Sequence, residues 1–262
     1  MSRSRRLVVA MAAAPAVALA AVLAFAPGSH SEPAVPPSQL PPPSQPAFAV
    51  PRPKPLRTQR GVSEFAVIGR AVTARVSPRP GARPIARVSL RTPEGTANVL
   101  QLLGKARLES GELWQQVRLA VLPNGTTGWV PRSALGSPVL RDTRLVVDRR
   151  RFRATLFRDG VRVFSAPIGV GEAQSTTPAG DFYVRDVLTR YRSPTYGPIA
   201  FGTSARSATL TDWPAGGYIG IHGTDQPGLI PGAISHGCIR MRNADILRLA
   251  KLMPVGTPVI IR

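Results

Sequence analysis

Cys238 and His222 are the residues of this sequence best suited to covalent chemistry. Cys238 is the only cysteine among the 262 residues, and two of the three histidines lie with it in residues 222–238. A cysteine acts as a nucleophile when its thiolate is favoured and a base lies within hydrogen-bond reach. The grouping therefore predicts acyl-transfer chemistry, with Cys238 as the nucleophile and His222 as the base.

The residues around the cysteine favour a reactive thiol. They form the run Ser235-His236-Gly237-Cys238-Ile239-Arg240-Met241. His236 and Arg240 add positive charge, and an expected helix just after the cysteine would place its positive end near a thiolate. Gly237 would let a substrate approach the backbone closely, and backbone N–H groups at such a turn are suitable oxyanion donors.

Each of these residues also has a purely structural interpretation. A lone cysteine is more often a small buried core residue, and a histidine at a strand end is more often a hydrogen-bonded structural residue. The Ser, His, Gly and Arg neighbours of Cys238 argue against a core role. Taken together, the residues favour the catalytic interpretation. With one cysteine and three histidines, the chain is also a poor candidate for a metal site built from these ligands.

The segment that must position these residues has the pattern of a mostly β domain. Alternating apolar residues flank Asp159-Gly160, which is a strong hairpin signature. One helix is expected, with Asn243 as its N-cap and Pro254 as its stop. The run 259–261 predicts a closing strand. The Gly- and Pro-rich stretch 188–217 is expected to be a loop or lid, whose aromatic residues either line a cleft or anchor the loop.

The motif residues resemble the catalytic domain of YkuD-type L,D-transpeptidases over about residues 143–262. The resemblance rests on His222-Gly223-Thr224, on the run around Cys238 and on the upstream run Thr-Pro-Ala-Gly-Asp-Phe-Tyr-Val. In that family the cysteine is the nucleophile and the upstream histidine is the base, often held by a following backbone carbonyl, which here falls on Gly223. The remaining family positions match Ser235, His236, Gly237 and Arg240.

The resemblance implies acyl transfer on peptidoglycan stem peptides. Cys238 would attack the third, diamino-acid residue of a tetrapeptide stem, and an amine from a neighbouring stem would resolve the thioester into a 3→3 cross-link. Water as the acceptor would make the protein an L,D-carboxypeptidase, and a non-catalytic wall-binding protein is the remaining alternative. No metal or organic cofactor is implied. The expected roles are cell wall organisation and cell shape.

Residues 61–140 are expected to form a second, smaller β domain. Short alternating runs are separated by turns such as Pro123-Asn124-Gly125. Trp114-x-x-Val117 followed by Gly128-Trp129-Val130 resembles bacterial SH3-like domains, which implies a wall-binding or spacer role. The expected fold class is therefore mainly β: a small SH3-like barrel followed at 141–262 by a mostly β catalytic domain with one docked helix.

The first 60 residues predict export followed by a linker. Three arginines precede an uncharged run from 7 to 26 that ends in Ala24-Phe25-Ala26, so residues 1–26 resemble a secretory signal or an uncleaved signal-anchor. Eleven prolines lie between Pro27 and Pro55, which favours an extended linker over 27–60. The expected location is the periplasm or cell wall, with membrane attachment only through the N-terminal segment if that segment is not cleaved.

The net charge of +20 is spread along the chain, with +6 in 1–60, +6 in 61–140 and +8 in 141–262. An evenly basic protein binds nucleic acid or lives at an anionic surface. The export segment and the lack of an aromatic-basic motif argue against nucleic acid. The expected partner is therefore an anionic cell wall.

Overall fold

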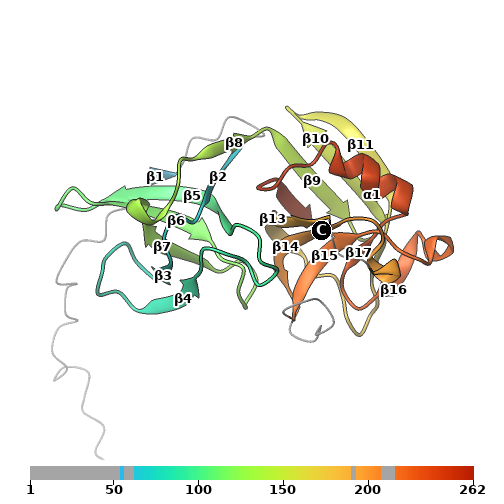
Figure 1. The fold of residues 1–262 in the computed structure, drawn as a ribbon, viewed down its shortest axis with the longest axis horizontal. Helices are drawn as coiled ribbons and strands as arrows, with labels where there is room; N and C mark the ends of the chain where they lie inside the picture. Colours follow the sequence, from blue (N-terminus) through green and yellow to red (C-terminus); the bar gives the residue numbers. More distant parts are fainter. Residues whose placement is uncertain (1–53, 56–61, 190–192, 208–215) are drawn as a thin grey trace, which may run out of the picture. The chain divides into compact units, whose positions relative to one another are not determined.

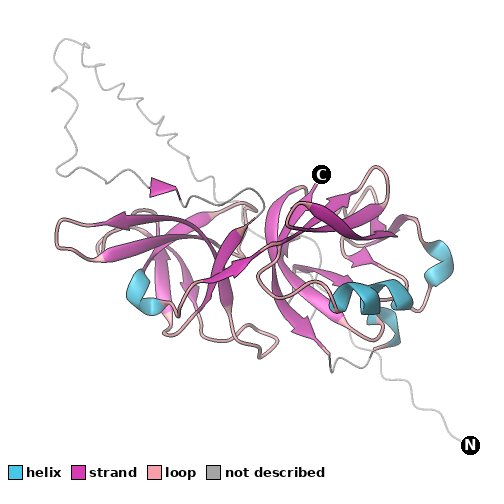
Figure 2. Cartoon of the chain, turned by 90° about the horizontal axis from the view of Figure 1, so that it is seen from above, coloured by secondary structure: helices cyan, strands magenta, loops and turns pink. Residues whose placement is uncertain are grey.

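The computed structural model describes residues 54–55, 62–189, 193–207 and 216–262. The expected signal segment and most of the expected linker therefore lie outside the described residues. Among the described residues, no helix is long and apolar enough to cross a membrane. The described strands belong to one compact unit, Phe48–Arg262, and form two sheets (Figures 1 and 2).

The N-terminal sheet has eight strands and the order β4-β3-β7-β6-β5-β2-β8, with β1 paired to β5. Its strands are β1 (Lys54–Pro55), β2 (Ser63–Val67), β3 (Val72–Arg75), β4 (Pro84–Val88), β5 (Val99–Arg107), β6 (Leu113–Arg118), β7 (Thr127–Pro131) and β8 (Val139–Arg141). The short β1 lies within the stretch expected to be linker. A 3₁₀ turn, η2 (Arg132–Ala134), follows β7.

Two groups of buried side chains hold this sheet together. Val117 and Val130 are fully buried in the larger group, which strands on both sides of β6 share. Trp114 and Trp129 pack with Ala106 in a second group. Both tryptophans of the SH3-like motif are thus core residues, and the SH3-like assignment stays a prediction.

The C-terminal sheet has ten strands and the order β11-β10-β9-β18-β13-β14-β15-β17-β12-β16. Its strands are β9 (Thr143–Asp148), β10 (Arg153–Arg158), β11 (Val161–Pro167), β12 (Gly169–Gly171), β13 (Gly180–Leu188), β14 (Ala200–Arg206), β15 (Tyr218–His222), β16 (Gly232–Ser235), β17 (Ile239–Arg240) and β18 (Pro258–Ile261). The 3₁₀ turns η3 (Pro194–Tyr196) and η4 (Pro227–Leu229) lie in its loops. The mainly β fold class is therefore confirmed.

Local sequence chemistry explains the hairpin and the last strand. Asp159 and Gly160, between β10 and β11, have φ values of 49° and 79°. A two-residue hairpin turn with both φ values positive matches the twist of the flanking strands, which is why Asp-Gly is favoured there. The closing strand is also confirmed as β18, which inserts between β9 and β13.

The expected helix is present, but its start differs from the prediction. The helix α1 (Asn243–Ala250), the one α-helix of the described residues, begins at Asn243 with Arg242 in the N-cap position. Asn243 as the N-cap was therefore wrong, because its side-chain oxygen accepts a hydrogen bond from the Thr224 N–H at 2.9 Å instead. Ile246 and Leu249 are fully buried and dock the helix onto the core.

Candidate active site

The pairing of β15 with β17 brings the two predicted catalytic residues to one region. His222 is the last residue of β15, and Cys238 directly precedes β17. These strands are parallel, with Ile221 beside Ile239 and His222 beside Arg240. Because side chains alternate along a strand, Cys238 shares a sheet face with His222.

The thiol of Cys238 lies against the backbone of β15. The register continues backward to place Gly220 beside Cys238, and the Gly220 N–H donates a hydrogen bond to the Cys238 Sγ at 3.4 Å. An N–H directed at a sulfur stabilises negative charge on it. This donor replaces the expected helix end, since β17 separates Cys238 from α1 and the cysteine is not directly before a helix.

A backbone carbonyl fixes the orientation of the His222 ring. The ring is almost completely buried, and its Nδ1 lies 2.6 Å from the carbonyl oxygen of Gly223. A carbonyl can only accept, so Nδ1 carries the proton in this contact, and in the neutral ring Nε2 has the lone pair. The neutral ring therefore has the tautomer that a general base needs.

The residues around His222 explain why Gly223 is a glycine. A Cβ added to Gly223 would overlap the Asn243 side-chain oxygen and would lie 3.0 Å from the Cα of Gly197. The ring of Tyr196, at the end of η3, packs against the His222 ring with centroids 4.6 Å apart and an angle of 58°. Tyr196 therefore packs against the histidine itself, while Asn243 at the start of α1 holds Thr224, two residues further along.

The turn before Cys238 is held by hydroxyl groups. Ser235 Oγ donates to the Cys238 carbonyl at 2.6 Å and accepts from the Gly237 N–H at 3.2 Å. Thr177 Oγ1 donates to the Gly237 carbonyl at 2.8 Å and accepts from the Gly171 N–H at 2.9 Å. Ser235 and Thr177 are both buried, so these bonds fix the turn that presents the thiol.

The other predicted site residues lie on or beside the same turn. Gly237 has a φ of 122°, a value that only glycine adopts easily, so its identity is set by the backbone. His236 is exposed. Arg240 lies beside His222 in the register, and its Nε is buried without a hydrogen-bond partner among the described residues. All seven predicted site residues thus fall within one part of the sheet.

Sequence reasoning missed Thr177, Tyr196 and Asn243 as site residues. Thr177 begins the upstream run that was part of the resemblance, so its position in the motif was a usable indication. Tyr196 was one of several aromatic residues in the stretch 188–217, and its sequence context did not distinguish it from Phe201, which is fully buried in the core. Tyr191 and Trp213 of that stretch lie outside the described residues.

A shallow open depression borders the histidine side of the site. It has a volume of about 660 Å³ and is lined by Ser193, Pro194, Gly197, Pro198, Asp225, Asn243 and Leu247. Gly197 and Asn243 both lie against Gly223. The depression therefore lies next to the buried Gly223, whose carbonyl holds His222. Within the described residues, no three His, Cys, Asp or Glu side chains are grouped as a metal site.

Comparison with known proteins agrees with this geometry. Residues 142–261 match the family model YkuD, the L,D-transpeptidase catalytic domain. The matched residues include every strand of the C-terminal sheet and the candidate active site. This match covers the whole Cys238 turn and His222, and the family it describes consists of acyltransferases.

Individual relatives extend the same likeness. The protein YkuD of Bacillus subtilis (strain 168), named as an L,D-transpeptidase, is 42% identical over 95 residues, which are 36% of this chain and 51% of that protein. YbiS of Escherichia coli (strain K12), also named as an L,D-transpeptidase, is 28% identical over 223 residues, which are 74% of this chain and 72% of that protein. The chain spans about half the length of the curated YkuD relatives that it matches.

Solved structures give a weaker likeness. The X-ray structure of an L,D-transpeptidase from Mycobacterium tuberculosis H37Rv is 16% identical, with a TM-score of 0.41, and the match covers 75% of this chain and 98% of that one.

Proposed function

We propose that this protein is a peptidoglycan L,D-transpeptidase that forms 3→3 cross-links through a thioester on Cys238. The observation that carries the proposal is the coincidence of the family match with a nucleophile and a base on one sheet face. The Gly220 N–H supports the thiol, and the Gly223 carbonyl fixes the His222 tautomer. A wall-binding protein without activity would need neither contact.

The proposed first step is acylation. His222 Nε2 accepts the thiol proton, and Cys238 Sγ attacks the carbonyl carbon of the diamino-acid residue in a tetrapeptide stem. Backbone N–H groups of the Cys238 turn stabilise the oxyanion. The tetrahedral intermediate then collapses, the bond to the terminal D-Ala breaks, and His222 returns the proton to the departing amine. The product is a thioester between Cys238 and the stem.

The proposed second step transfers the acyl group to an amine. The side-chain amine of a neighbouring stem attacks the thioester carbonyl and loses a proton to His222, and the proton returns to the departing thiolate of Cys238. An amide forms, the thioester breaks and the enzyme is regenerated. If water attacks instead, the product is a tripeptide stem and the protein is an L,D-carboxypeptidase.

We further propose that Arg240 and Gly237 serve the substrate. Arg240 is partly exposed and lies on the strand beside His222, so its guanidinium is a chemically suitable partner for a substrate carboxylate or carbonyl. The Gly237 backbone carries no side chain that would block a stem peptide. The exposed His236 adds positive charge at the rim when it is protonated.

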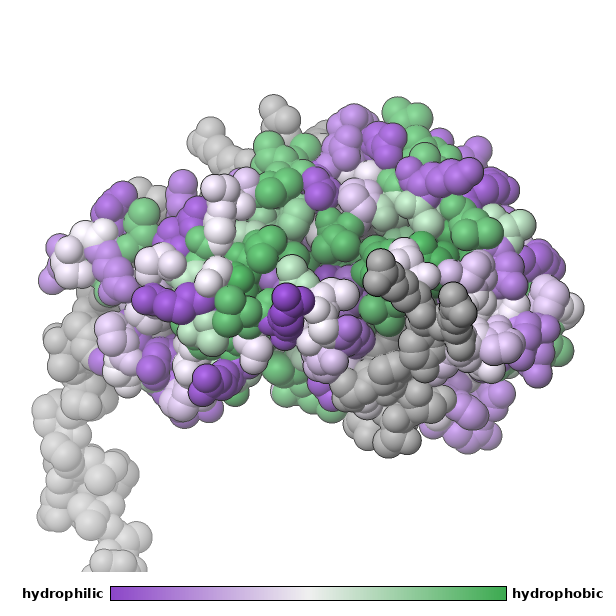
Figure 3. Space-filling view, in the orientation of Figure 1, coloured by the Kyte–Doolittle hydropathy of each residue, from purple (hydrophilic) through white to green (hydrophobic). Residues whose placement is uncertain are grey.

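We propose that the chain works outside the cytoplasm, at the anionic cell wall. Support comes from the basic N-terminal segment with its uncharged run and from the net charge of +20. The face drawn in Figure 3 has hydrophilic side chains toward both of its ends and hydrophobic ones between them. Binding to isolated, anionic wall material that weakens as salt is raised would support this location.

One experiment separates the candidate functions. The purified protein is incubated with a disaccharide-tetrapeptide, and the products are analysed by mass spectrometry beside a Cys238→Ala control. A 3→3 linked dimer that requires Cys238 supports the transpeptidase. A tripeptide product alone identifies a carboxypeptidase. If neither product forms, and no β-lactam adduct appears on Cys238, the acyl-transfer proposal is wrong and wall binding takes its place.

A further inference from the structure

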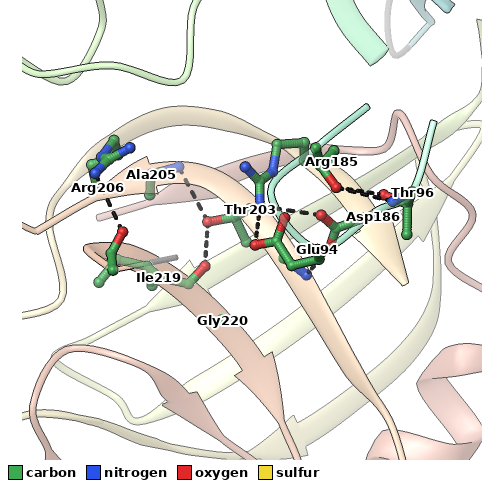
Figure 4. Close-up of polar contacts among 12 residues, drawn as sticks. Glu94, Thr96, Arg185, Asp186, Thr203, Ala205, Arg206, Ile219 and Gly220 are labelled. Carbon is green, nitrogen blue, oxygen red and sulfur yellow. Dashed lines mark hydrogen bonds and ion pairs between the residues drawn. The ribbon is translucent and has the colours of Figure 1, made fainter. Parts of the chain in front are cut away.

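A cluster of buried charges lies away from the cysteine, where a loop of the N-terminal sheet meets β13. Glu94, in the loop between β4 and β5, contacts Arg185 of β13, and Arg185 also contacts Asp186 (Figure 4). The three side chains are 3%, 3% and 0% exposed. Removing one partner from such a group leaves an uncompensated buried charge, so each member depends on the others.

A bulge explains how two consecutive residues of one strand can both be buried. The β13–β14 register shifts between Val184 and Asp186, so Arg185 is the extra residue. A bulge redirects side chains and is common beside active sites. Here the bulge places the Arg185 guanidinium 2.5 Å from Glu94 and 3.1 Å from Asp186.

Arg185 also contacts the start of the strand that carries His222. Its guanidinium carbon lies 3.7 Å from the centroid of the Tyr218 ring, and that of Arg206 lies 4.2 Å from the same centroid. Tyr218 is the first residue of β15. Cation–π contacts of this kind become stronger when they are removed from water. The charge cluster therefore holds β15 at the end opposite His222.

Two hydrogen bonds from neighbouring glycines of β14 and β15 relate Asp186 to the thiol. Asp186 Oδ1 accepts the Gly202 N–H at 3.0 Å. Gly202 pairs with Gly220 across β14 and β15, and the Gly220 N–H donates to Cys238 Sγ. The two glycines thus lie side by side with their N–H groups directed outward, one to the carboxylate and one to the sulfur. A Cβ on Gly202 would overlap Asp186, so the carboxylate fits only beside glycine.

A loop of the N-terminal sheet also forms hydrogen bonds with the end of β14. Asn124, in the loop between β6 and β7, donates to the Arg206 carbonyl at 2.7 Å and accepts from the Arg206 N–H at 2.9 Å. The Tyr183 hydroxyl donates to the Val99 carbonyl at 3.1 Å. The Glu94 contact is therefore one of several between the N-terminal sheet and the strands β13 and β14.

We propose that Glu94, Arg185 and Asp186 form a positioning triad through which the N-terminal sheet holds the Gly220 N–H against Cys238 Sγ. Glu94 fixes Arg185, Arg185 fixes Asp186 and the Tyr218 end of β15, and Asp186 fixes Gly202 beside Gly220. The N-terminal sheet is then part of the catalytic apparatus. The proposal rests on the proposed function only where turnover is measured, because the reactivity of the thiol can be measured without substrate.

The test compares Glu94→Gln with Glu109→Gln in the full chain. Glu109 is an exposed carboxylate in the turn between β5 and β6 and serves as the matched control. The first measurement is the rate of Cys238 alkylation by iodoacetamide as a function of pH. We expect Glu94→Gln to move the midpoint of this profile to higher pH and to lower kcat about tenfold, with KM unchanged. Glu94→Asp, which keeps the carboxylate, should restore part of both.

The possible failures are distinguishable. If Glu94→Gln melts at a lower temperature but its alkylation profile and kcat equal those of Glu109→Gln, the triad is only structural and the inference is overturned. If Glu94→Gln does not fold, the double variant Glu94→Leu/Arg185→Met replaces the pair by apolar groups, and an unchanged alkylation profile in it overturns the inference. If wild-type turnover does not need Cys238, the proposed function fails instead, while the alkylation profiles still test the triad.

Discussion

The two ends of strand β15 are held by different physical means. At the His222 end the contacts are made by neutral groups: the Gly223 carbonyl, the Gly220 N–H and the hydroxyls of Ser235 and Thr177. At the Tyr218 end they are made by buried charges, with Arg185 between carboxylates and an aromatic ring.

The difference follows from what each end has to do. The groups that contact Cys238 and His222 are fixed backbone dipoles and hydroxyls, which can stabilise a charge that develops during a reaction without reorganising. At the far end, ion pairs give directional contacts between segments that are distant in the sequence, at the cost of removing charges from water.

The Tyr218 end of β15, here called the charged end, also differs from the His222 end, here called the neutral end, in having a carboxyl group with a shifted pKa, Asp186. Burial raises the pKa of Asp186 to about 6, with Arg185 opposing the increase and Glu94 adding to it. Burial lowers the pKa of Arg185, but Asp186 and Glu94 outweigh it, so that the net change is upward. The guanidinium therefore stays charged, and Asp186 is expected to change protonation near pH 6.

The largest expected effect is the loss of product formation when the thiol at the neutral end is removed. Cys238→Ala removes the nucleophile, so formation of cross-linked dimer or tripeptide should fall by about 10³-fold or more. The measurement is product formation by mass spectrometry, with a thermal melt to show that the fold is kept. Product formation at near the wild-type rate by the folded variant would contradict the nucleophile assignment.

A second change tests whether the hydroxyl network is needed at the neutral end. Thr177→Val leaves the Gly237 carbonyl and the Gly171 N–H without their buried partner, which should cost about 1–3 kcal/mol of unfolding free energy. The measurement is urea unfolding, with the alkylation rate of Cys238 as a second readout. The control is Thr176→Val at the neighbouring exposed position. Equal unfolding midpoints in the two variants would show that the bonds contribute nothing.

A third prediction concerns the charged end and pH. The pKa of Asp186 in the folded state, about 6, exceeds its ordinary value of 3.8, so the folded state binds the proton more tightly. Its contribution to stability is present below pH 4 and is lost as the pH rises through 6. Wild type should therefore lose unfolding free energy over this window relative to Asp186→Asn. The exposed Asp181→Asn is the control, and parallel curves for wild type and Asp186→Asn would refute the prediction.

The smallest expected effect concerns the aromatic contact between Tyr196 and His222 at the neutral end. Tyr196→Ala removes the ring beside His222, and an aromatic contact of this kind is worth about 0.5–1.5 kcal/mol. Steady-state kinetics should show kcat reduced by a few-fold to about tenfold. Tyr196→Phe keeps the ring and should stay near wild type. A loss of the same size in Tyr196→Phe would assign the effect to the hydroxyl group.

Much of the site was predictable because its signature is local. The run 235–241 and His222 contain the sole cysteine and two of the three histidines of the chain, and they lie within a short stretch. The hairpin at Asp159-Gly160 was predictable for a related reason, since only few residues tolerate two successive positive φ values. The helix start was not, because Asn243 makes a tertiary contact with Thr224 that competes with capping.

The sequence by itself determined the mainly β fold class and the catalytic-domain resemblance, and it predicted Cys238 as the nucleophile and His222 as the base, since each depends on residue type and close spacing. The SH3-like resemblance and the export segment stay predictions. Only the tertiary structure decided which group supports the thiol, which hydroxyls hold its turn and which distant carboxylate meets Arg185. These contacts depend on strand register and on a bulge, where a shift of one residue exchanges the two faces of a sheet. No local pattern around Glu94 specifies a partner on β13.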